Sequence, residues 1–530
     1  MSDVPTFSLL WEYLEHWAHV LPALEAVVFK DRRTSYEQLN ETADTFAKAL
    51  IRFGVKKGDR VVTLFNPGQE FLTVFFGSSK IGAVTVPFDV RYKKDEIRHL
   101  CTITQPKVIV CGEQASAREL VELQPSLEHV ERFVFAGGCE LIARGVTLQE
   151  ALRDRRTDLN ETLDRMKNDV LENDDLMIVF TGGTTGVPKG ARLSHRNFIS
   201  MNVRAHEIFN LNHSDRLLVH LPPSHVGGVM DMMTQSLVSG ITMVILEHFR
   251  PDSALQLIEK EKVTIFGQVP TMFAMEFGLP NFSKYDLSSV RLIMAAGEMT
   301  SPELMAKILS LGKLFGISYG CTEADGMTYT RPEDPPEKLM GTGYVGKPLR
   351  DVEVRVVDQE RRTIAAMRHG EVAVRGPTVC KGYYKMPEET AASFDNQGWF
   401  YTGDMGYLDN DGGLYLVGRK KQIIRTGSYT VLPKEIEDVL ASDPRVLLAS
   451  VVGVPDSIYG EVSWAFVVPR QGANITPDEL QRRCVERLAD YKIPKKLIIR
   501  DSLPITRLGK IAIAQLKEEA TKLKLAENKA

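Results

Sequence analysis

Short β-branched and apolar runs alternate with segments of helical periodicity through most of the chain before Asp351. Segments such as Thr42–Phe53 and Ser253–Lys260 carry apolar residues three and four positions apart, which predicts helices. This alternation predicts an α/β fold with mostly parallel sheets, in which ligands bind where loops gather at the carboxyl ends of strands. The runs expected to form strands are Arg60–Phe65, Val84–Pro87, Lys107–Val110, Leu217–Leu221, Val263–Phe266, Val290–Met294 and Leu314–Ser318.

The pattern changes twice after Asp351. A small antiparallel β subdomain is expected first, with turns such as Asn410–Gly413, and then a small α+β unit. Because 530 residues exceed one ordinary core, we expect an N-terminal domain of residues 1–420 and a C-terminal domain of residues 421–530. The antiparallel strands are expected at Val352–Val357, Gly370–Val374 and Tyr415–Val417, the later helices at Lys434–Leu440 and Pro477–Leu488, and the later strands at Ala449–Val454 and Ser463–Val468.

The composition disfavours several classes of protein. A net charge of −4 gives no support for a nucleic-acid partner. Six cysteines without a CxxC pair favour free thiols in a reducing compartment and disfavour a zinc site. The first twenty residues are typical of an amphipathic helix and not of a signal peptide, and Val226–Leu246 is expected to be a buried helix and strand and not a membrane span. We therefore expect a cytoplasmic protein, whose oligomeric state the sequence leaves open.

A glycine- and threonine-rich loop, Phe180–Gly190, follows an apolar run directly. Glycines let several backbone N–H groups face one point, threonine hydroxyls add donors, and a lysine adds positive charge, so the loop predicts a polyphosphate ligand. It is not a Walker A motif, because Pro188 precedes the lysine and Gly190 follows it, which disfavours a kinase or an ordinary P-loop ATPase. An ordinary surface turn is the alternative. The residues expected to bind the phosphates are Thr181, Gly182, Gly183, Thr184, Thr185, Gly186 and Lys189.

Six polar loops in a fixed order resemble those of the adenylate-forming superfamily, which includes acyl-CoA synthetases, nonribosomal adenylation domains and luciferases. The resemblance covers essentially the whole chain. Its elements are the phosphate loop Phe180–Gly190, the histidine loop Leu221–Gly228, the Tyr-Gly-x-Thr-Glu element Tyr319–Glu323, the Tyr-Thr-Gly-Asp element Tyr401–Asp404, the hinge Gly418–Lys421 and the lysine loop Leu503–Lys510.

The resemblance implies a two-step reaction that uses ATP, Mg²⁺ and coenzyme A. A carboxylate and ATP give an acyl-adenylate and pyrophosphate, and a thiol then displaces AMP. Lys510 is implied to bridge the α-phosphate and the carboxylate, Glu323 and Thr184 to hold Mg²⁺, and His225 to orient the acyl group and the thiol. Such chemistry depends on positioning and on electrostatic stabilisation of the reacting anions. Without the resemblance, Lys510 is typical of an exposed lysine in a turn.

Further residues are implied to bind the nucleotide. Asp404 and Arg419 match the pair that grips the ribose hydroxyls, and from the residues alone a weak surface ion pair remains the alternative. Tyr319 is implied to lie against the adenine, with a core tyrosine as the alternative. The other residues implied at the nucleotide site are Gly297, Glu298, Gly320 and Thr322.

The second half-reaction is implied to involve a swing of the small domain about Lys421, after which Gly427 lies beside the pantetheine arm of CoA. Two departures from the family pattern bear on the site. Gly182 stands where relatives usually carry serine, and Thr426-Gly427-Ser428 replaces a more usual Ser-Gly-Gly.

The expected substrate is a medium-chain, cyclic or aryl carboxylic acid. Acetate-specific relatives place a tryptophan where this chain has Gly320, so a deeper acyl pocket is expected, with walls at Gly267–Met272 and Ala295–Ala296. Amino-acid-activating relatives place an aspartate beside the histidine loop, whereas here Asp231 lies six residues beyond His225. An enzyme that loads a carrier protein's phosphopantetheine, a silent nucleotide-binding relative and a luciferase-like oxygenase remain the alternatives.

Overall fold

The computed structural model describes residues 4–137, 143–153, 158–181, 188–298, 300, 302–340, 343–427, 429–506 and 510–527. Gly182 to Gly186 of the phosphate loop, Ser428, and residues 507–509 of the lysine loop lie outside the described residues. None of the described helices is both long enough and apolar enough to cross a lipid bilayer.

One sheet has seven strands in the order β7-β6-β5-β3-β4-β8-β9. Neighbouring strands run parallel except at the edge, where β9 pairs antiparallel with β8 and places Lys189 opposite Thr181. The strands are β3 (Arg60–Leu64), β4 (Val84–Pro87), β5 (Val108–Cys111), β6 (Arg132–Phe135), β7 (Gly145–Thr147), β8 (Asp175–Thr181) and β9 (Lys189–Ser194).

The second large sheet has nine strands in the order β16-β15-β14-β13-β12-β10-β11-β1-β2. Its inner strands are parallel, and antiparallel strands close both edges. The strands are β1 (Glu25–Phe29), β2 (Arg32–Ser35), β10 (Arg216–Val219), β11 (Thr242–Ile245), β12 (Ile265–Gln268), β13 (Leu292–Ala296), β14 (Leu314–Cys321), β15 (Ala324–Tyr329) and β16 (Lys347–Pro348).

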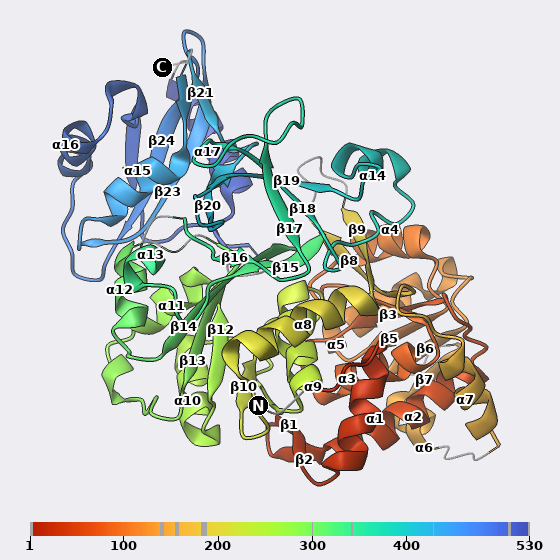
Figure 1. Cartoon of the computed structure of the whole chain (residues 1–530). Coiled ribbons are helices and arrows are strands. Elements are labelled where there is room, and N and C mark those ends of the chain that lie inside the picture. The colour runs from red at the N-terminus through yellow and green to blue at the C-terminus, as the bar shows by residue number, and fades with distance from the viewer. Residues whose placement is uncertain are drawn as a thin grey trace.

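Helices α3, α8 and α9 run between the two large sheets (Figure 1). The Ser194 hydroxyl accepts a hydrogen bond from the Asn197 backbone and so caps the start of α8. Helix α3 is buried along nearly its whole length, because both of its sides face other elements. The described helices of the N-terminal region include α1 (Leu10–Val20), α2 (Tyr36–Arg52), α3 (Gln69–Lys80), α4 (Lys94–Thr104), α5 (Gln114–Leu123), α8 (His195–Phe209), α9 (Gln235–Ser239), α10 (Pro251–Glu261), α11 (Pro270–Phe277) and α12 (Pro302–Leu309).

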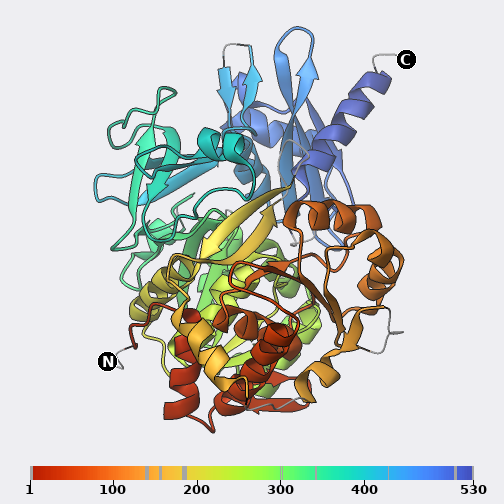
Figure 2. The ribbon, with the colours of Figure 1, turned by 90° about the vertical axis from the view of Figure 1, so that its right-hand side faces the viewer.

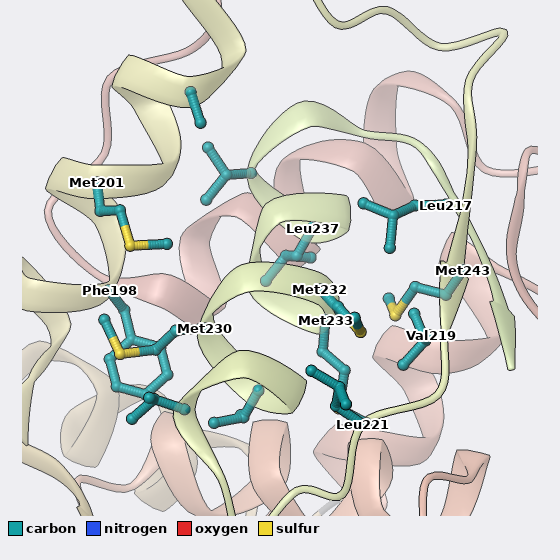
Figure 3. Close-up of a cluster of buried hydrophobic side chains, with 14 of the residues drawn as sticks. Phe198, Met201, Leu217, Val219, Leu221, Met230, Met232, Met233, Leu237 and Met243 are labelled. Carbon is teal, nitrogen blue, oxygen red and sulfur yellow. The ribbon is translucent and has the colours of Figure 1, made fainter. Parts of the chain in front are cut away.

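The predicted buried helix after the histidine loop begins as a π-helix, η2 (Gly227–Thr234), and continues as α9. Figure 3 shows its methionines packed on two sides: Met230 beside Phe198 and Met201, and Met232 and Met233 beside apolar side chains of β10 and β11. Such wide turns occur frequently at functional sites. Asp231 is the only residue of η2 that is not buried.

The remaining chain forms two smaller sheets at one end of the molecule (Figures 1 and 2). The four-stranded antiparallel sheet contains β17 (Glu353–Val357), β18 (Gly370–Arg375), β19 (Phe400–Leu408) and β20 (Leu414–Arg419). The C-terminal unit contains β21 (Ile424–Thr426), β22 (Tyr429–Val431), β23 (Val446–Asp456), β24 (Gly460–Pro469) and β25 (Lys496–Ile499), with helices α15 (Pro433–Ala441), α16 (Pro477–Arg487) and α17 (Ile513–Glu527).

The predicted α/β class, with parallel sheets, a small antiparallel sheet and a C-terminal α+β unit, is confirmed. The predicted strands differ from the observed ones by only a few residues, for example Val290–Met294 against Leu292–Ala296. The domain boundary at residue 421 stays a prediction; it falls between the end of β20 at Arg419 and the start of β21 at Ile424.

Candidate active site

Three candidate residues follow strands of the nine-stranded sheet. His225 follows β10, Gly297 follows β13, and Glu323 follows β14. These strands run parallel through β12, so their carboxyl ends meet at one edge of the sheet. The topology therefore gathers loops that lie far apart in sequence.

Lys510 reaches this edge from the C-terminal unit. Its Nζ donates a hydrogen bond to the Gly297 carbonyl oxygen at 2.7 Å. Two bonds to Thr506 hold the lysine loop: the Lys510 backbone N–H donates to the hydroxyl at 3.1 Å, and the Thr506 N–H donates to the Lys510 carbonyl at 2.5 Å. Burial lowers the pKa of Lys510, and the nearby carboxylates Glu298 and Asp404 oppose that shift. The Lys510 ammonium group thus lies near two carboxyl groups and near the Arg419 guanidinium.

Gly297 is shaped for this contact. Its φ of +84° lies in the left-handed region, which disfavours other residues, and a Cβ at this position would lie 3.1 Å from Lys510 Nζ. The next residue, Glu298, accepts a hydrogen bond from Thr271 Oγ1 at 3.1 Å. Burial raises the pKa of Glu298, against the lowering effect of Lys510. The Gly297–Glu298 turn therefore presents a carbonyl oxygen and a carboxyl group to the lysine.

Asp404 lies between Tyr319 and Arg419. The Tyr319 hydroxyl donates to Asp404 Oδ2 at 2.8 Å, and Arg419 Nε lies 3.0 Å from Oδ1. The register of β19 and β20 sets Asp404 directly opposite Arg419. The Asp404 side chain is 9% exposed, whereas that of Arg419 is 62% exposed, so the pair opens outward on the arginine side. Because two donors fix the Asp404 carboxylate, its position is better defined than that of a carboxylate in an exposed surface ion pair.

Glu323 is linked to the phosphate-loop lysine through Tyr383. The Tyr383 hydroxyl donates to Glu323 Oε1 at 2.7 Å, and Lys189 Nζ lies 4.8 Å from the centre of the tyrosine ring. The Cys380 backbone N–H also donates to the Glu323 carbonyl at 2.7 Å. These contacts join the turn between β14 and β15, strand β9 and the segment before α14 (Pro387–Ser393) into one corner.

His225 is held as a neutral ring. Its Nδ1 accepts a hydrogen bond from the Gly227 N–H at 3.0 Å, which leaves the ring proton on Nε2. Burial, together with the charge of Lys510, lowers the pKa of His225 to about 3. Gly228 is required in the same turn, because a Cβ there would lie 2.4 Å from the Pro222 carbonyl oxygen. The geometry suits an orienting N–H donor and disfavours a cationic histidine.

Some of the predicted site residues do not lie together with the residues described above. Thr181 and Lys189 flank the phosphate loop as partners on β8 and β9, whereas Gly182, Gly183, Thr184, Thr185 and Gly186 lie outside the described residues. Lys421 is exposed beyond β20, and Gly427 is exposed at the tip of the β21–β22 hairpin with a φ of +60° and no atom near a built Cβ. Thr322 is buried beside Glu323.

Three side chains of this region were not predicted as site residues: Tyr383, Asp325 and Thr271, of which Thr271 was expected only as pocket wall. Tyr383 contacts a residue sixty positions earlier, and a tyrosine in a Gly-Tyr-Tyr segment carries no local signal for such a contact. Asp325 fills the space beside Gly320: a Cβ on Gly320 would lie 2.4 Å from Asp325 Oδ1. The expected deepening of the pocket at Gly320 is therefore limited by a carboxyl group from the next strand.

The arrangement can bring anions together. Lys510, Lys189 and Arg419 supply positive charge, backbone groups and the neutral His225 supply orienting contacts, and Glu323 supplies a hard oxygen ligand. No described cluster of three or more His, Cys, Asp or Glu side chains could hold a metal by protein ligands alone.

Comparisons with known proteins show the family of this chain. The family model described as AMP-binding enzyme matches residues 14–384, and the model of the AMP-binding enzyme C-terminal domain matches residues 435–510. An indoleacetate–CoA ligase of Aromatoleum aromaticum is 32% identical, over 95% of this chain and 96% of that protein. The long-chain-fatty-acid–CoA ligase FadD13 of Mycobacterium tuberculosis is also 32% identical, over 96% and 97%.

Two solved structures share the fold over nearly their full length. The anthranilate CoA ligase AuaEII in complex with anthranoyl-AMP has a TM-score of 0.86 at 25% identity, covering 99% of each chain. ATP-bound MatB from Rhodopseudomonas palustris has a TM-score of 0.84 at 26% identity, covering 98% of this chain and all of that one. Since the first family model spans well over half of the residues, the chain belongs to the AMP-binding enzymes, as a member of the adenylate-forming superfamily of the acyl-CoA synthetase type.

Proposed function

We propose that this protein is an ATP-dependent carboxylate–CoA ligase that forms an acyl-adenylate and then an acyl-CoA thioester. The observation that carries the proposal is the Lys510 Nζ contact with the Gly297 carbonyl, which places this ammonium group within electrostatic reach of Glu298, Asp404 and Arg419. Relatives named as CoA ligases for indoleacetate, ferulate and long-chain fatty acids, and a neighbour solved with anthranoyl-AMP, support the same reaction class.

The proposed role of each site residue follows from its charge. Lys510 stabilises the negative charge that gathers on the α-phosphate as the carboxylate approaches, while Lys189 and the phosphate loop hold the outer phosphates. Asp404, fixed by Tyr319 and Arg419, accepts hydrogen bonds from the ribose hydroxyls. His225 donates from Nε2 to the acyl group without changing its charge.

We propose that Glu323 holds Mg²⁺ together with Thr184 of the phosphate loop. Oε1 of Glu323 accepts from Tyr383, and among the described residues no hydrogen bond to Oε2 is found, so one carboxylate oxygen fits a hard cation. Mg²⁺ binds one or two carboxylates and completes its shell with phosphate oxygens and water, which agrees with a site of few protein ligands. When bound, the ion neutralises phosphate charge.

The proposed acyl substrate is a medium-chain, cyclic or aryl acid, and coenzyme A is the proposed acceptor. Val269, Thr271 and Met272 are buried and, with Ala295, support a mainly apolar wall. The small domain, residues 421–530, is proposed to swing about Lys421 so that Gly427 approaches the pantetheine arm. A cytoplasmic location is proposed from the cysteine content, as Cys101, Cys111, Cys321, Cys380 and Cys484 are free thiols.

The test is carboxylate-dependent pyrophosphate release and thioester formation by the purified protein, over a panel of acids with and without CoA. Pyrophosphate and thioester with the same acids are expected. Release of pyrophosphate without a thioester would shift the acceptor to a carrier protein, and no adenylate with any acid would overturn the enzyme proposal.

A further inference from the structure

The turn that carries Asp404 interrupts the small antiparallel sheet. The pairing of β18 with β19 shifts between Glu371 and Ala373, so residues 402–404 of β19 stand opposite the single residue Val372. Such a bulge re-aims the side chains of the bulged strand and leaves backbone groups without partners in the ladder. The turn that is proposed to bind the ribose therefore needs other groups to hold it.

Two side chains bind the backbone of this bulge. The Gly403 N–H donates to Glu371 Oε1 at 3.1 Å. The Thr402 hydroxyl accepts from the Asp404 N–H at 3.0 Å and donates to the Val372 carbonyl oxygen at 2.9 Å. The side chain of Glu371 is only 13% exposed, so its carboxylate lies within the turn and not on the surface. Glu371 thus supplies a hydrogen bond that the interrupted ladder does not supply.

The other oxygen of Glu371 holds the chain where it leaves β20. Lys420 Nζ donates to Glu371 Oε2 at 2.7 Å, and the Lys420 backbone N–H donates to the Gly403 carbonyl oxygen at 2.9 Å. Three hydrogen bonds therefore join Glu371, Gly403 and Lys420 in a closed ring. Lys420 directly precedes Lys421, about which the small domain is proposed to swing. One carboxylate thus contacts both the ribose turn and the last residue of the part that is proposed to stay fixed.

The place of this contact matters more than its strength. The Lys420 side chain is 52% exposed, and an ion pair of this kind contributes little to the stability of a fold. However, Gly403 directly precedes Asp404. Lys420 directly follows Arg419. The ring therefore binds the backbone beside each member of the ribose pair, where a small displacement of a binding group is enough to weaken its contact with a ligand.

We propose that Glu371 is a positioning residue that fastens the hinge to the ribose-binding turn. The inference rests on the proposed ligase function and its domain swing, and it assigns a role to a residue outside the six polar loops. With Lys420 held, rotation of the small domain begins at Lys421, and Asp404 and Arg419 keep their places through both half-reactions. The nucleotide part of the acyl-adenylate then stays bound while the small domain moves.

The kinetics of the two half-reactions test this role, with the acid that releases pyrophosphate fastest and its acyl-adenylate. Glu371→Gln keeps the volume and an acceptor for the Gly403 N–H but removes the charge that pairs with Lys420. The KM for ATP in pyrophosphate release and the KM for supplied acyl-adenylate in thiolysis are both expected to rise about threefold to tenfold, while the KM for CoA stays unchanged. Glu353→Gln is the matched control, because it breaks an ion pair with Arg375 in the same sheet. A rise in only one of the first two KM values would overturn the proposal.

A double-variant cycle shows whether the carboxylate and the lysine act as a unit. Lys420→Gln is expected to raise both KM values as Glu371→Gln does, and the double variant is expected to be no worse than either single variant. Lys420→Arg keeps the positive charge and should remain close to the wild type. Effects that multiply in the double variant would mean that the two residues act independently, and they would overturn the proposal.

Trypsin cleavage gives a readout that needs no activity. The hinge carries three cleavage sites, Arg419, Lys420 and Lys421, and without the contact to Glu371 the chain there is expected to open more often. Cleavage at the hinge should be at least about threefold faster in Glu371→Gln than in the wild type and in Glu353→Gln, with circular dichroism confirming the fold of each variant. Unchanged cleavage or unchanged KM values in a folded Glu371→Gln protein would overturn the inference and leave the ligase function standing. Absence of pyrophosphate release by the wild type with every acid would overturn the ligase function, whereas the cleavage rates would still decide for or against the contact.

Discussion

Lys510 donates a hydrogen bond to the carbonyl oxygen of Gly297 at 2.7 Å, although 213 residues separate them in sequence. The lysine comes from the C-terminal unit and the glycine from the edge of the nine-stranded sheet, so the contact closes one part of the molecule over the other (Figure 2). In the proposed reaction, this contact belongs to the arrangement of the first half-reaction, in which the adenylate forms.

Lys510→Ala should abolish adenylate formation and largely spare thioester formation from supplied acyl-adenylate. Loss of a preorganised charge at the reacting centre is expected to lower kcat by at least about 10²-fold. Separate assays of pyrophosphate release and of thiolysis measure the two steps. Lys522→Ala is the matched control, since Lys522 pairs with Glu518 on the exposed surface of α17. Equal loss of both half-reactions would contradict the proposed swing of the small domain.

Gly297→Ala should impair adenylation through the lysine contact. The new Cβ would lie 3.1 Å from Lys510 Nζ, and misplacement of the ammonium group is expected to reduce kcat about tenfold or more. Gly312→Ala is a close control: its φ of +65° also lies in the left-handed region, but nothing lies within 4 Å of its built Cβ. Equal adenylation activity in the two variants would mean that the contact between Lys510 and Gly297 does not contribute to adenylation.

Tyr383→Phe should raise the Mg²⁺ concentration needed for half-maximal adenylation about tenfold, because it removes a hydrogen bond to a charged carboxylate. The ring beneath Lys189 remains, so packing is preserved. A titration of Mg²⁺ at fixed ATP gives the readout. Tyr401→Phe removes a similar bond, from a tyrosine to Asp395 outside the site, and should leave the Mg²⁺ dependence unchanged.

Asp404→Asn should reduce kcat/KM for ATP by about tenfold or more, since an amide offers one acceptor where the carboxylate offers two. With 2′,3′-dideoxy-ATP the wild type and the variant should perform alike, because the hydroxyls that Asp404 grips are missing. If the variant discriminated between the two nucleotides as strongly as the wild type, Asp404 would not bind the ribose.

Glu276→Gln should stabilise the protein more at pH 8 than at pH 5. Burial raises the pKa of Glu276 to about 8 from its ordinary value of 4.5, while Gln268 Nε2 donates to its Oε1 at 2.8 Å. Because of the raised pKa, the folded state holds a proton that the unfolded chain releases. The contribution of Glu276 to the free energy of unfolding is therefore fully present below pH 4.5 and is lost as the pH rises toward 8, by at most about 1.4 kcal/mol per pH unit. Thermal unfolding at both values measures the difference, with the exposed Glu41→Gln as control.

The sequence predicts the fold class well because strands and helices differ in period, and a run such as Val84–Pro87 has only one reasonable assignment. It does not predict that the helix after His225 begins as a π-helix, since the periods of the two helix types are too close over eight residues. The sequence also does not predict strand register. Asp404 lies opposite Arg419 because of the way in which β19 pairs with β20.

Motifs single out Glu323 and Lys510 as candidate site residues, but the contacts between one motif and another could not be predicted from the sequence. Tyr383 and Asp325 act through neighbours in space, and neither stands in a pattern that singles it out. For the same reason, the sequence does not predict the surroundings of Gly320. A glycine indicates that no side chain is present at that position, but not which side chain from another strand occupies the space.

The separation of Lys510 from the rest of the site has a consequence during biosynthesis. Ribosomes make the chain from its N-terminus, so His225, Gly297, Glu323, Asp404 and Arg419 are all translated before the lysine. An N-terminal part of the chain can therefore fold before Lys510 has been made. With the role proposed for Lys510, a chain that ends before this residue is expected to bind ATP without consuming it.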